Sequence, residues 1–279
     1  MAAKAPFAWY GGKATLAKWV IGHFPDHQVY VEPFGGAASV LVAKPPSPVE
    51  IYNDLDERLV NFFRVLQEPQ SFTVLQRLLE LTPYSRSEWK YRQNETKWEN
   101  DMRSAADFFI HCRMARGGFG GTTISSTLFA VSTRVRRGMC ENVSKYLSAI
   151  EGLPELVERF RSVAIEGLPA EEIIQRYDGS DTLFYCDPPY LPETRSESTR
   201  KVYAQEMSRR DHWTLLCCLL EVTGKVVISG YLHKMYDDML DGWVRITKKT
   251  HTKINSKRSP RTEVLWMNFT PPASGDTGD

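Results

Sequence analysis

Residues 29–39 read VYVEPFGGAAS, and this stretch decides the fold class. Its first half is a short apolar run of β-branched and aromatic residues, which predicts a buried strand. The pair Gly35 and Gly36 then predicts a tight turn into the small, apolar start of a helix. A second strand is predicted at residues 50–54, and residues 57–66 carry apolar side chains at helical spacing. The N-terminal part is therefore predicted to be a βαβα unit with parallel strands.

Strand-like sequence returns only after a long middle region. Residues 67–162 are predicted to form a mainly helical insertion with a Gly- and Ser/Thr-rich loop at 116–127. Further strands are predicted at 162–166, 182–187 and 225–229, and an antiparallel pair at 243–247 and 263–268. We therefore expect an α/β domain built from residues 1–66 and 163–270, interrupted by the insertion. The Pro- and Gly-rich tail at 271–279 is predicted to be disordered.

Composition places the chain among ordinary globular proteins. Of its 279 residues, 42% are hydrophobic and 25% are charged, with a net charge of +1. A basic surface for nucleic acid must therefore be local. The five cysteines include no pair with metal-site spacing, so we expect reduced thiols and no metal. No run approaches the roughly 18 apolar residues of a membrane span, so we expect no membrane partner and a cytoplasmic location.

The strand end at residues 32–36 has the character of a site where a ligand lies against backbone. Glycines allow close approach, because they have no Cβ. Asp54 ends the next strand, about twenty residues on, where a carboxylate can accept hydrogen bonds from ribose hydroxyls. No phosphate-cradling loop is present, so a phosphate-free nucleoside fits better than a dinucleotide. The alternative interpretation is a turn with packing glycines and a solvated Asp54. The predicted ligand-binding residues of this stretch are Glu32, Pro33, Phe34, Gly35 and Gly36.

A second group of residues follows the apolar run 183–186, in the order Asp187, Pro188, Pro189 and Tyr190. Prolines fix φ and remove backbone donors, so Asp187 and the Pro188 carbonyl can face one cavity as acceptors only. Two acceptors favour the positively charged amine that forms when an exocyclic amine is alkylated. Tyr190 can stack on the base that carries this amine. The alternative is a simple Asp-Pro turn after a strand.

At these residues the chain resembles the Dam-type DNA adenine methyltransferases, in which the cofactor motif precedes the recognition region and the catalytic motif follows it. The matching blocks are WYGGK at 9–13, VEPFGGAASV at 31–40, Asn53-Asp54, and YCDPPY at 185–190. They occur in family order and frame residues 1–66 and 163–270. The resemblance implies a Rossmann-like methyltransferase sheet, mostly parallel with an antiparallel last strand. It also implies that residues 67–162 are an inserted target-recognition domain.

The resemblance further implies S-adenosylmethionine as cofactor and an adenine, flipped out of double-stranded DNA, as substrate. Trp9 and Lys13 would contact the cofactor near its amino-acid end, with Tyr10 in the same cofactor-binding block. Asp54 would take the ribose hydroxyls, Asp187 would touch both the methionine amine and the target amine, and Tyr190 would stack on the base.

Basic residues outside these motifs are candidates for DNA contact. Residues 245–261 carry basic side chains and no acid between two predicted strands, so we expect an exposed hairpin loop that binds phosphates. Two arginines flank the glycine-rich loop and could enter a groove. A solvated basic surface is the alternative interpretation for each group. The predicted DNA contacts are Arg113, Arg116, Arg134, Arg136, Arg137, Lys253, Lys257, Arg258 and Arg261.

Other functions remain open at this point. An RNA adenine or DNA cytosine-N4 methyltransferase would use a similar site, and a DNA-binding regulator could keep the fold without catalysis. Asp187 to Tyr190 and the motif order favour adenine. We expect the protein to act as a monomer or weak dimer.

Overall fold

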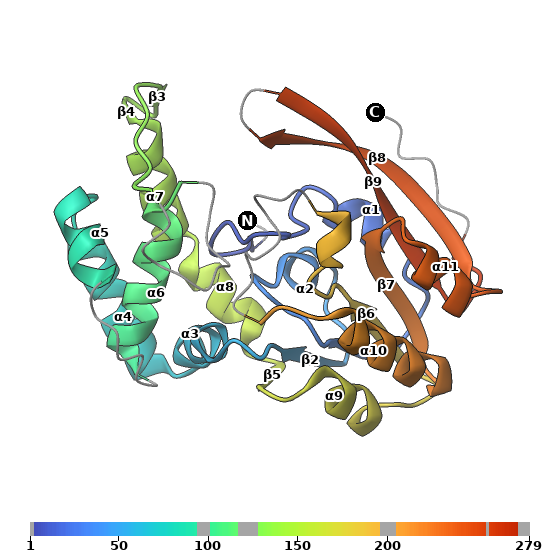
Figure 1. Ribbon diagram of the computed structural model, residues 1–279. Helices are drawn as coiled ribbons and strands as arrows, with labels where there is room; N and C mark the ends of the chain where they lie inside the picture. Colours follow the sequence, from blue (N-terminus) through green and yellow to red (C-terminus); the bar gives the residue numbers. More distant parts are fainter. Residues whose placement is uncertain (1–2, 94–100, 117–127, 196–204, 255–256, 273–279) are drawn as a thin grey trace.

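A seven-stranded sheet runs through the molecule in the order β5-β2-β1-β6-β7-β9-β8 (Figure 1). The computed structural model describes residues 3–93, 101–116, 128–195, 205–254 and 257–272, without the side chains at 93 and 251–260. Strands β5, β2, β1, β6 and β7 are parallel, and β9 runs antiparallel between β7 and β8. This confirms the expected mostly parallel sheet with a reversed last strand. Its strands are β1 (Val29–Glu32), β2 (Val49–Asn53), β5 (Val163–Glu166), β6 (Thr182–Cys186), β7 (Lys225–Tyr231), β8 (Val244–Ile254) and β9 (Lys257–Met267).

Helices cover both faces of the sheet, because successive side chains of its buried strands point to opposite faces. Tyr30 and Leu183 belong to one buried cluster, whereas their neighbours Val31 and Phe184 belong to another. The first face is covered by α1 (Ala17–Ile21), α2 (Ser39–Ala43) and α3 (Glu57–Gln67). The second is covered by α9 (Ala170–Arg176), α10 (Arg209–Glu221) and α11 (Lys234–Met239). The α/β class predicted from the sequence is therefore confirmed.

The middle of the chain is mainly helical and lies to one side of the sheet (Figure 1). It contains α4 (Pro69–Leu81), α5 (Arg86–Gln93), α6 (Met102–Met114), α7 (Glu141–Glu151), α8 (Leu153–Phe160) and the short hairpin β3 (Val135–Arg136) and β4 (Met139–Cys140). Most of its buried apolar residues belong to the same cluster as those of the first sheet face. Phe62 of α3 stacks on Phe109 of α6, with ring centroids 5.9 Å apart. The bounds of the insertion at 67 and 162 stay a prediction.

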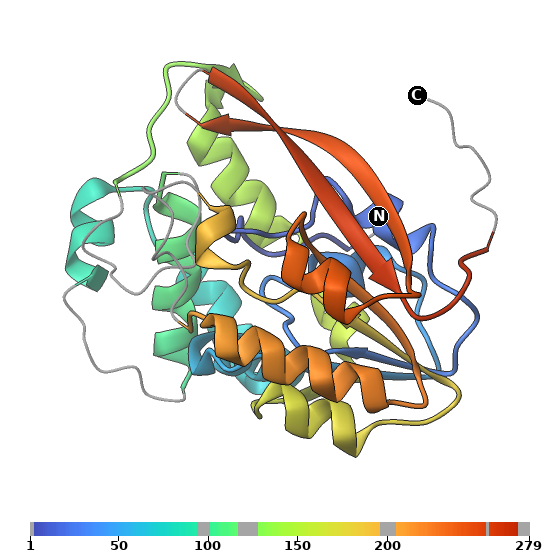
Figure 2. The same cartoon turned by 45° about the vertical axis from the view of Figure 1, so that its right-hand side comes forward.

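The prediction of an exposed loop at residues 245–261 is wrong. Strands β8 and β9 run through this stretch and pair in continuous register, from Val244 opposite Met267 to Ile254 opposite Lys257. Alternating β-branched residues favour a strand here, and long basic side chains are common on an edge strand such as β8. The far end of this hairpin and the β3–β4 hairpin lie at the same end of the molecule, uppermost in both views (Figures 1 and 2).

Parts of two sequence predictions lie outside the described residues: most of the glycine-rich loop, at 117–127, and most of the tail, at 273–279. Among the described residues, no helix combines the length and the apolar character needed to cross a bilayer.

Candidate functional site

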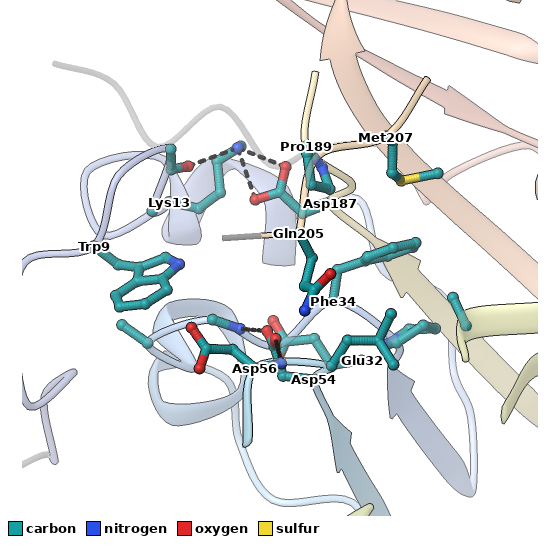
Figure 3. Close-up of a pocket in the computed structure, with 18 of the residues that line it drawn as sticks. Trp9, Lys13, Glu32, Phe34, Asp54, Asp56, Asp187, Pro189, Gln205 and Met207 are labelled. Atoms are coloured by element: carbon teal, nitrogen blue, oxygen red, sulfur yellow. Dashed lines mark hydrogen bonds and ion pairs between the residues drawn. The ribbon is translucent and has the colours of Figure 1, made fainter. Parts of the chain in front are cut away.

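A cavity of about 310 Å³ opens at the carboxyl ends of β1, β2 and β6 (Figure 3). This is the edge of a parallel sheet where ligands bind in open α/β folds. Its lining includes every residue predicted to bind cofactor: Trp9, Tyr10, Lys13, Glu32, Pro33, Phe34, Gly35, Gly36, Asp54 and Asp187. Pro189 of the predicted catalytic motif also lines it, whereas Pro188 and Tyr190 do not. Residues that the sequence analysis did not identify complete the wall, among them Asp56, Glu171, Gln205 and Met207.

The turn after β1 needs both of its glycines, for different reasons. A Cβ on Gly35 would lie 2.2 Å from the ring of Tyr52, so the backbone packs directly on that ring. Gly36 has φ +49, which favours glycine, and a Cβ there would lie 2.9 Å from the Trp9 indole. The Tyr52 hydroxyl donates to the Gly36 carbonyl at 2.7 Å. This packing fixes the turn that forms the floor of the cavity.

Asp54 stands at the end of β2 and contributes a carboxylate to the cavity wall. Its Oδ2 accepts from the backbone N–H of Gly36 at 2.8 Å, and its Oδ1 accepts from the N–H of Asp56 at 2.8 Å. Burial nevertheless raises the pKa of Asp54 to about 6, because desolvation outweighs the two hydrogen bonds. The carboxylate is therefore fixed in place, and close to neutral pH it is still mainly ionised.

Glu32 ends β1 beside Asp54, on the same wall of the cavity (Figure 3). Burial and, after it, the negative charge of Asp187 raise the pKa of Glu32 well above its usual range. Its Oε2 is buried and has no hydrogen-bond partner in the described part of the chain. A buried carboxyl oxygen without a donor is costly, so this wall is suited to a ligand that brings donors or positive charge.

Asp187 faces this wall from the other side of the cavity and is held by two side chains (Figure 3). Lys13 Nζ lies 2.6 Å from Oδ1 and 2.8 Å from Oδ2 of Asp187, and it also donates to the Gly11 carbonyl at 3.0 Å. Ser229, two residues before the end of β7, donates to Oδ1 at 2.7 Å. Burial alone would lower the pKa of Lys13, but the charges of Asp187 and Glu263 raise it above its ordinary value. The N-terminal motif and the Asp-Pro-Pro-Tyr motif therefore meet in one buried ion pair.

Tyr190 lies behind this ion pair and is buried. Its hydroxyl donates to Glu263 of β9, and its ring makes an edge contact with Tyr231, with centroids 4.6 Å apart. Lys13 Nζ lies 4.8 Å from the centre of the same ring. Ser229 and Glu263 were both missed in the sequence analysis. Ser229 could have been found from its place near the carboxyl end of a parallel strand. Glu263 could have been found as an acid in a strand that is buried on both faces.

The predicted DNA contacts are distributed over the helical region and the β8–β9 hairpin. Arg113 lies in the last turn of α6, and burial lowers its pKa to about 10. Arg137 has φ +56 and pairs with Glu151 at 3.0 Å. Arg134 and Arg136 are exposed at the β3–β4 hairpin, and Arg116 is exposed two residues after the end of α6. Arg261 of β9 lies over the ring of Tyr231 at 5.0 Å. The side chains of Lys253, Lys257 and Arg258 lie outside the described residues.

Comparisons with known proteins agree with this geometry. Residues 9–254 match the family model of the D12 class N6 adenine-specific DNA methyltransferases. The chain is similar to the DNA adenine methylases of two Vibrio cholerae serotype O1 strains, with 26% identity over 249 residues, 82% of this chain and 81% of theirs. It is also similar to Type II methyltransferase M1.LlaDCHI of Lactococcus lactis subsp. cremoris, with 23% identity over 95% of both chains.

The family match spans the N-terminal motif, the cavity wall and the Asp-Pro-Pro-Tyr motif, and it confirms the resemblance seen in the sequence. The chain therefore belongs to the D12 class of N6 adenine-specific DNA methyltransferases.

Proposed function

We propose that the methyl donor is S-adenosylmethionine, bound in the cavity, and that the acceptor is N6 of an adenine flipped out of double-stranded DNA. One observation carries the proposal: Asp187 of the Asp-Pro-Pro-Tyr motif and the carboxylates of Asp54 and Glu32 line the same cavity. Asp187 can accept a hydrogen bond from the acceptor amine, and Asp54 and Glu32 can bind a cationic nucleoside.

The cavity fits such a cofactor by the chemistry of its walls. S-adenosylmethionine supplies a methyl group on a sulfonium, which leaves readily. Asp54 would accept from the ribose hydroxyls, and the unpartnered oxygen of Glu32 suits a ligand that carries positive charge and donors. Trp9 and Phe34 offer aromatic surface for the adenine ring of the cofactor. Lys13 and Asp187 would lie at the amino-acid end.

Asp187 and the Pro188 carbonyl are acceptors for the target amine. The lone pair of N6 is delocalised into the purine ring, and two acceptors on its N–H groups favour the pyramidal, positively charged amine of the transition state. Lys13 and Ser229 hold the Asp187 carboxylate in one orientation. Because both oxygens of Asp187 already contact Lys13, the target amine must share or displace that contact.

Adenine N6 cannot reach this cavity from inside a duplex, so the base has to leave the stack. In the proposed complex the helical insertion reads sequence, and basic residues of the β3–β4 and β8–β9 hairpins contact phosphates. Their common position at one end of the molecule supports this arrangement (Figures 1 and 2). A monomer or weak dimer and a cytoplasmic location stay predictions.

The test is methyl transfer from labelled S-adenosylmethionine to unmethylated double-stranded DNA, followed by nucleoside mass spectrometry. We expect N6-methyladenine with the wild-type protein. Asp187→Ala is the matched control: transfer should fall at least about 100-fold while DNA binding largely survives. Transfer by this variant within about tenfold of wild type would contradict the catalytic assignment. Label in N4-methylcytosine would make cytosine the substrate, and label found only in RNA would make RNA the substrate. No label in either would favour a non-catalytic DNA-binding protein.

A further inference from the structure

Glu263 is a buried acid that neither the cavity nor the sequence motifs include. It lies on β9, opposite Tyr231 of β7, and its side chain is 5% exposed. Its Oε1 accepts from the hydroxyl of Tyr190, 73 residues earlier in the chain. The same Oε1 lies 3.5 Å from Lys13 Nζ. One carboxyl group thus joins the reversed strand to both motifs of the candidate site.

Burying a carboxylate at this position costs free energy, which suggests that the acid is retained for a function. The strand residues that follow Glu263 are packed on both faces, with Leu265 in one buried cluster and Val264 in the other. Burial raises the pKa of Glu263, and the charge of Lys13 and the hydroxyl of Tyr190 only partly oppose this shift. An apolar side chain of similar size would fit a buried strand at lower cost.

We propose that Glu263 is a positioning residue for methyl transfer: it anchors the Tyr190 ring through its hydroxyl and gives Lys13 a second counter-charge beside Asp187. The inference rests on the proposed function, in which Tyr190 supports the target base. Glu263 itself is not among the cavity-lining residues, so it acts through its neighbours.

The contacts of Tyr190 explain why an anchor matters. Tyr231 meets the ring edge-on at 4.6 Å, and Lys13 lies 4.8 Å from its centre. Both contacts are made by the ring of Tyr190, whereas its hydroxyl donates to Glu263. A tyrosine that lacks this anchor can pivot about its Cα–Cβ bond and carry the stacked base away from Asp187. Displacement of a reacting group by about 1 Å can cost about 100-fold in rate.

The test is a double-mutant cycle on kcat, with cofactor affinity measured in parallel by calorimetry. Glu263→Leu removes the acceptor and the charge, Tyr190→Phe removes the donor, and Glu263→Gln keeps an acceptor of the same shape. Thr262→Val, next to Glu263 on β9, is the control for changes in the strand itself and should leave kcat within about twofold of wild type.

We expect Glu263→Leu and Tyr190→Phe each to lower kcat by about 10- to 100-fold, with the cofactor Kd changed less than about threefold. The double variant should be no slower than Glu263→Leu, because that variant already lacks the hydrogen bond that Tyr190→Phe removes. Glu263→Gln should recover most of the lost kcat. If Glu263→Leu does not fold, Tyr190→Phe tests the anchor, since it removes the same hydrogen bond, and its kcat should still fall by about 10- to 100-fold while that of Glu263→Gln stays near wild type.

Three results overturn the inference: an unchanged kcat in Glu263→Leu, effects that multiply in the double variant, or Glu263→Gln as slow as Glu263→Leu. Failure of the proposed function looks different, because the wild-type protein would then produce no N6-methyladenine and both proposals would fall together. If the wild type transfers methyl groups and the Glu263 variants have an unchanged kcat, only the positioning role of Glu263 is overturned.

Discussion

Several carboxyl groups at the carboxyl edge of the sheet are buried, although burial of a carboxylate is unfavourable in free energy. Burial raises the pKa of Glu32, Asp54 and Glu263, and each has only partial compensation from donors or from a nearby cation. Such groups are expected where the protein must meet a positively charged ligand or a developing charge, since the ligand then supplies the missing counter-charge. Burial of these carboxylates lowers the free energy of unfolding of the free protein, and a ligand that supplies the counter-charge recovers this free energy as binding affinity.

For Asp54 we predict opposite effects of pH on cofactor binding and on stability. The pKa of about 6 in the folded protein exceeds that of the unfolded chain, so folding takes up a proton between these values. The free protein therefore gains stability from this group as pH falls through 6. Cofactor binding should weaken by up to about tenfold between pH 7 and pH 5, because the ribose hydroxyls need the ionised carboxylate.

Calorimetry of S-adenosylmethionine binding to wild type and Asp54→Asn at both pH values tests this expectation. The variant should bind more weakly at pH 7 and should lose this part of the pH dependence. An unchanged dissociation constant at pH 7 would remove Asp54 from the cofactor site.

The sequence predicted the residues that belong to contiguous motifs. Asp54 and Asp187 follow predicted strands, so local pattern was sufficient to single them out, whereas Lys13 was identified through the family resemblance; all three line the cavity. Ser229 and Glu263 carry no such pattern, because their contacts with Asp187 and Tyr190 form only when β7 and β9 take their places in the sheet. The position of Tyr190 likewise depends on that pairing: its edge contact with Tyr231 of β7 and its hydrogen bond to Glu263 of β9 are tertiary contacts.

At the scale of elements, the β8–β9 hairpin is the main difference between expectation and structure. The helices and parallel strands were predictable, because their hydrophobic periodicity extends over whole elements. The antiparallel pair at 243–247 and 263–268 was predicted, but the basic stretch between its two strands was taken for a loop because its charge concealed the alternation of β-branched residues. Eleven residue pairs connect β8 and β9. The basic residues therefore stand on a regular ribbon instead of a loose segment.

For this ribbon we predict a phosphate-binding role that does not depend on sequence. Charge reversal of both Lys257 and Arg258 should weaken binding to all duplexes alike and lower the slope of log K against log salt by about 2, close to one for each lost phosphate contact. The measurement is a salt titration of DNA binding with several unrelated duplexes.

Arg161→Glu is the matched control for this prediction. Arg161 is exposed and precedes β5, at the end of the sheet opposite to the cavity, so its reversal should leave the slope unchanged. A loss of affinity confined to one duplex sequence in the Lys257 and Arg258 variant would instead make the ribbon a reader of bases.

At the scale of the whole molecule, one buried cluster extends from the sheet into the helical middle of the chain, which was predicted to be an insertion. Phe108 of α6 meets Phe7 edge-on at 5.3 Å, and its neighbour Phe109 stacks on Phe62 of α3. The insertion and the first sheet face thus share their core. We expect the protein to unfold in one cooperative transition, because neither part buries its apolar surface alone.

Phe108→Ala should lower the free energy of unfolding by about 3–5 kcal/mol, since it leaves a cavity where the two parts meet. Denaturant titration followed by circular dichroism and by tryptophan fluorescence should give coincident curves for wild type and variant. The control is Leu81→Ala, which changes a side chain that is 63% exposed and should have little effect. Two separate transitions would show that the insertion folds independently.

The meeting of Lys13, Asp187 and Glu263 also bears on how the protein is made. Lys13 leaves the ribosome 174 residues before Asp187, roughly 10–35 s earlier at ordinary rates of synthesis. Glu263 follows Tyr190 by a further 73 residues. Until β9 emerges, the edge of β7 has no partner and is open to association with other nascent chains. A chain that stops before residue 263 would therefore leave β7 without the strand beside it and the Tyr190 hydroxyl without its acceptor.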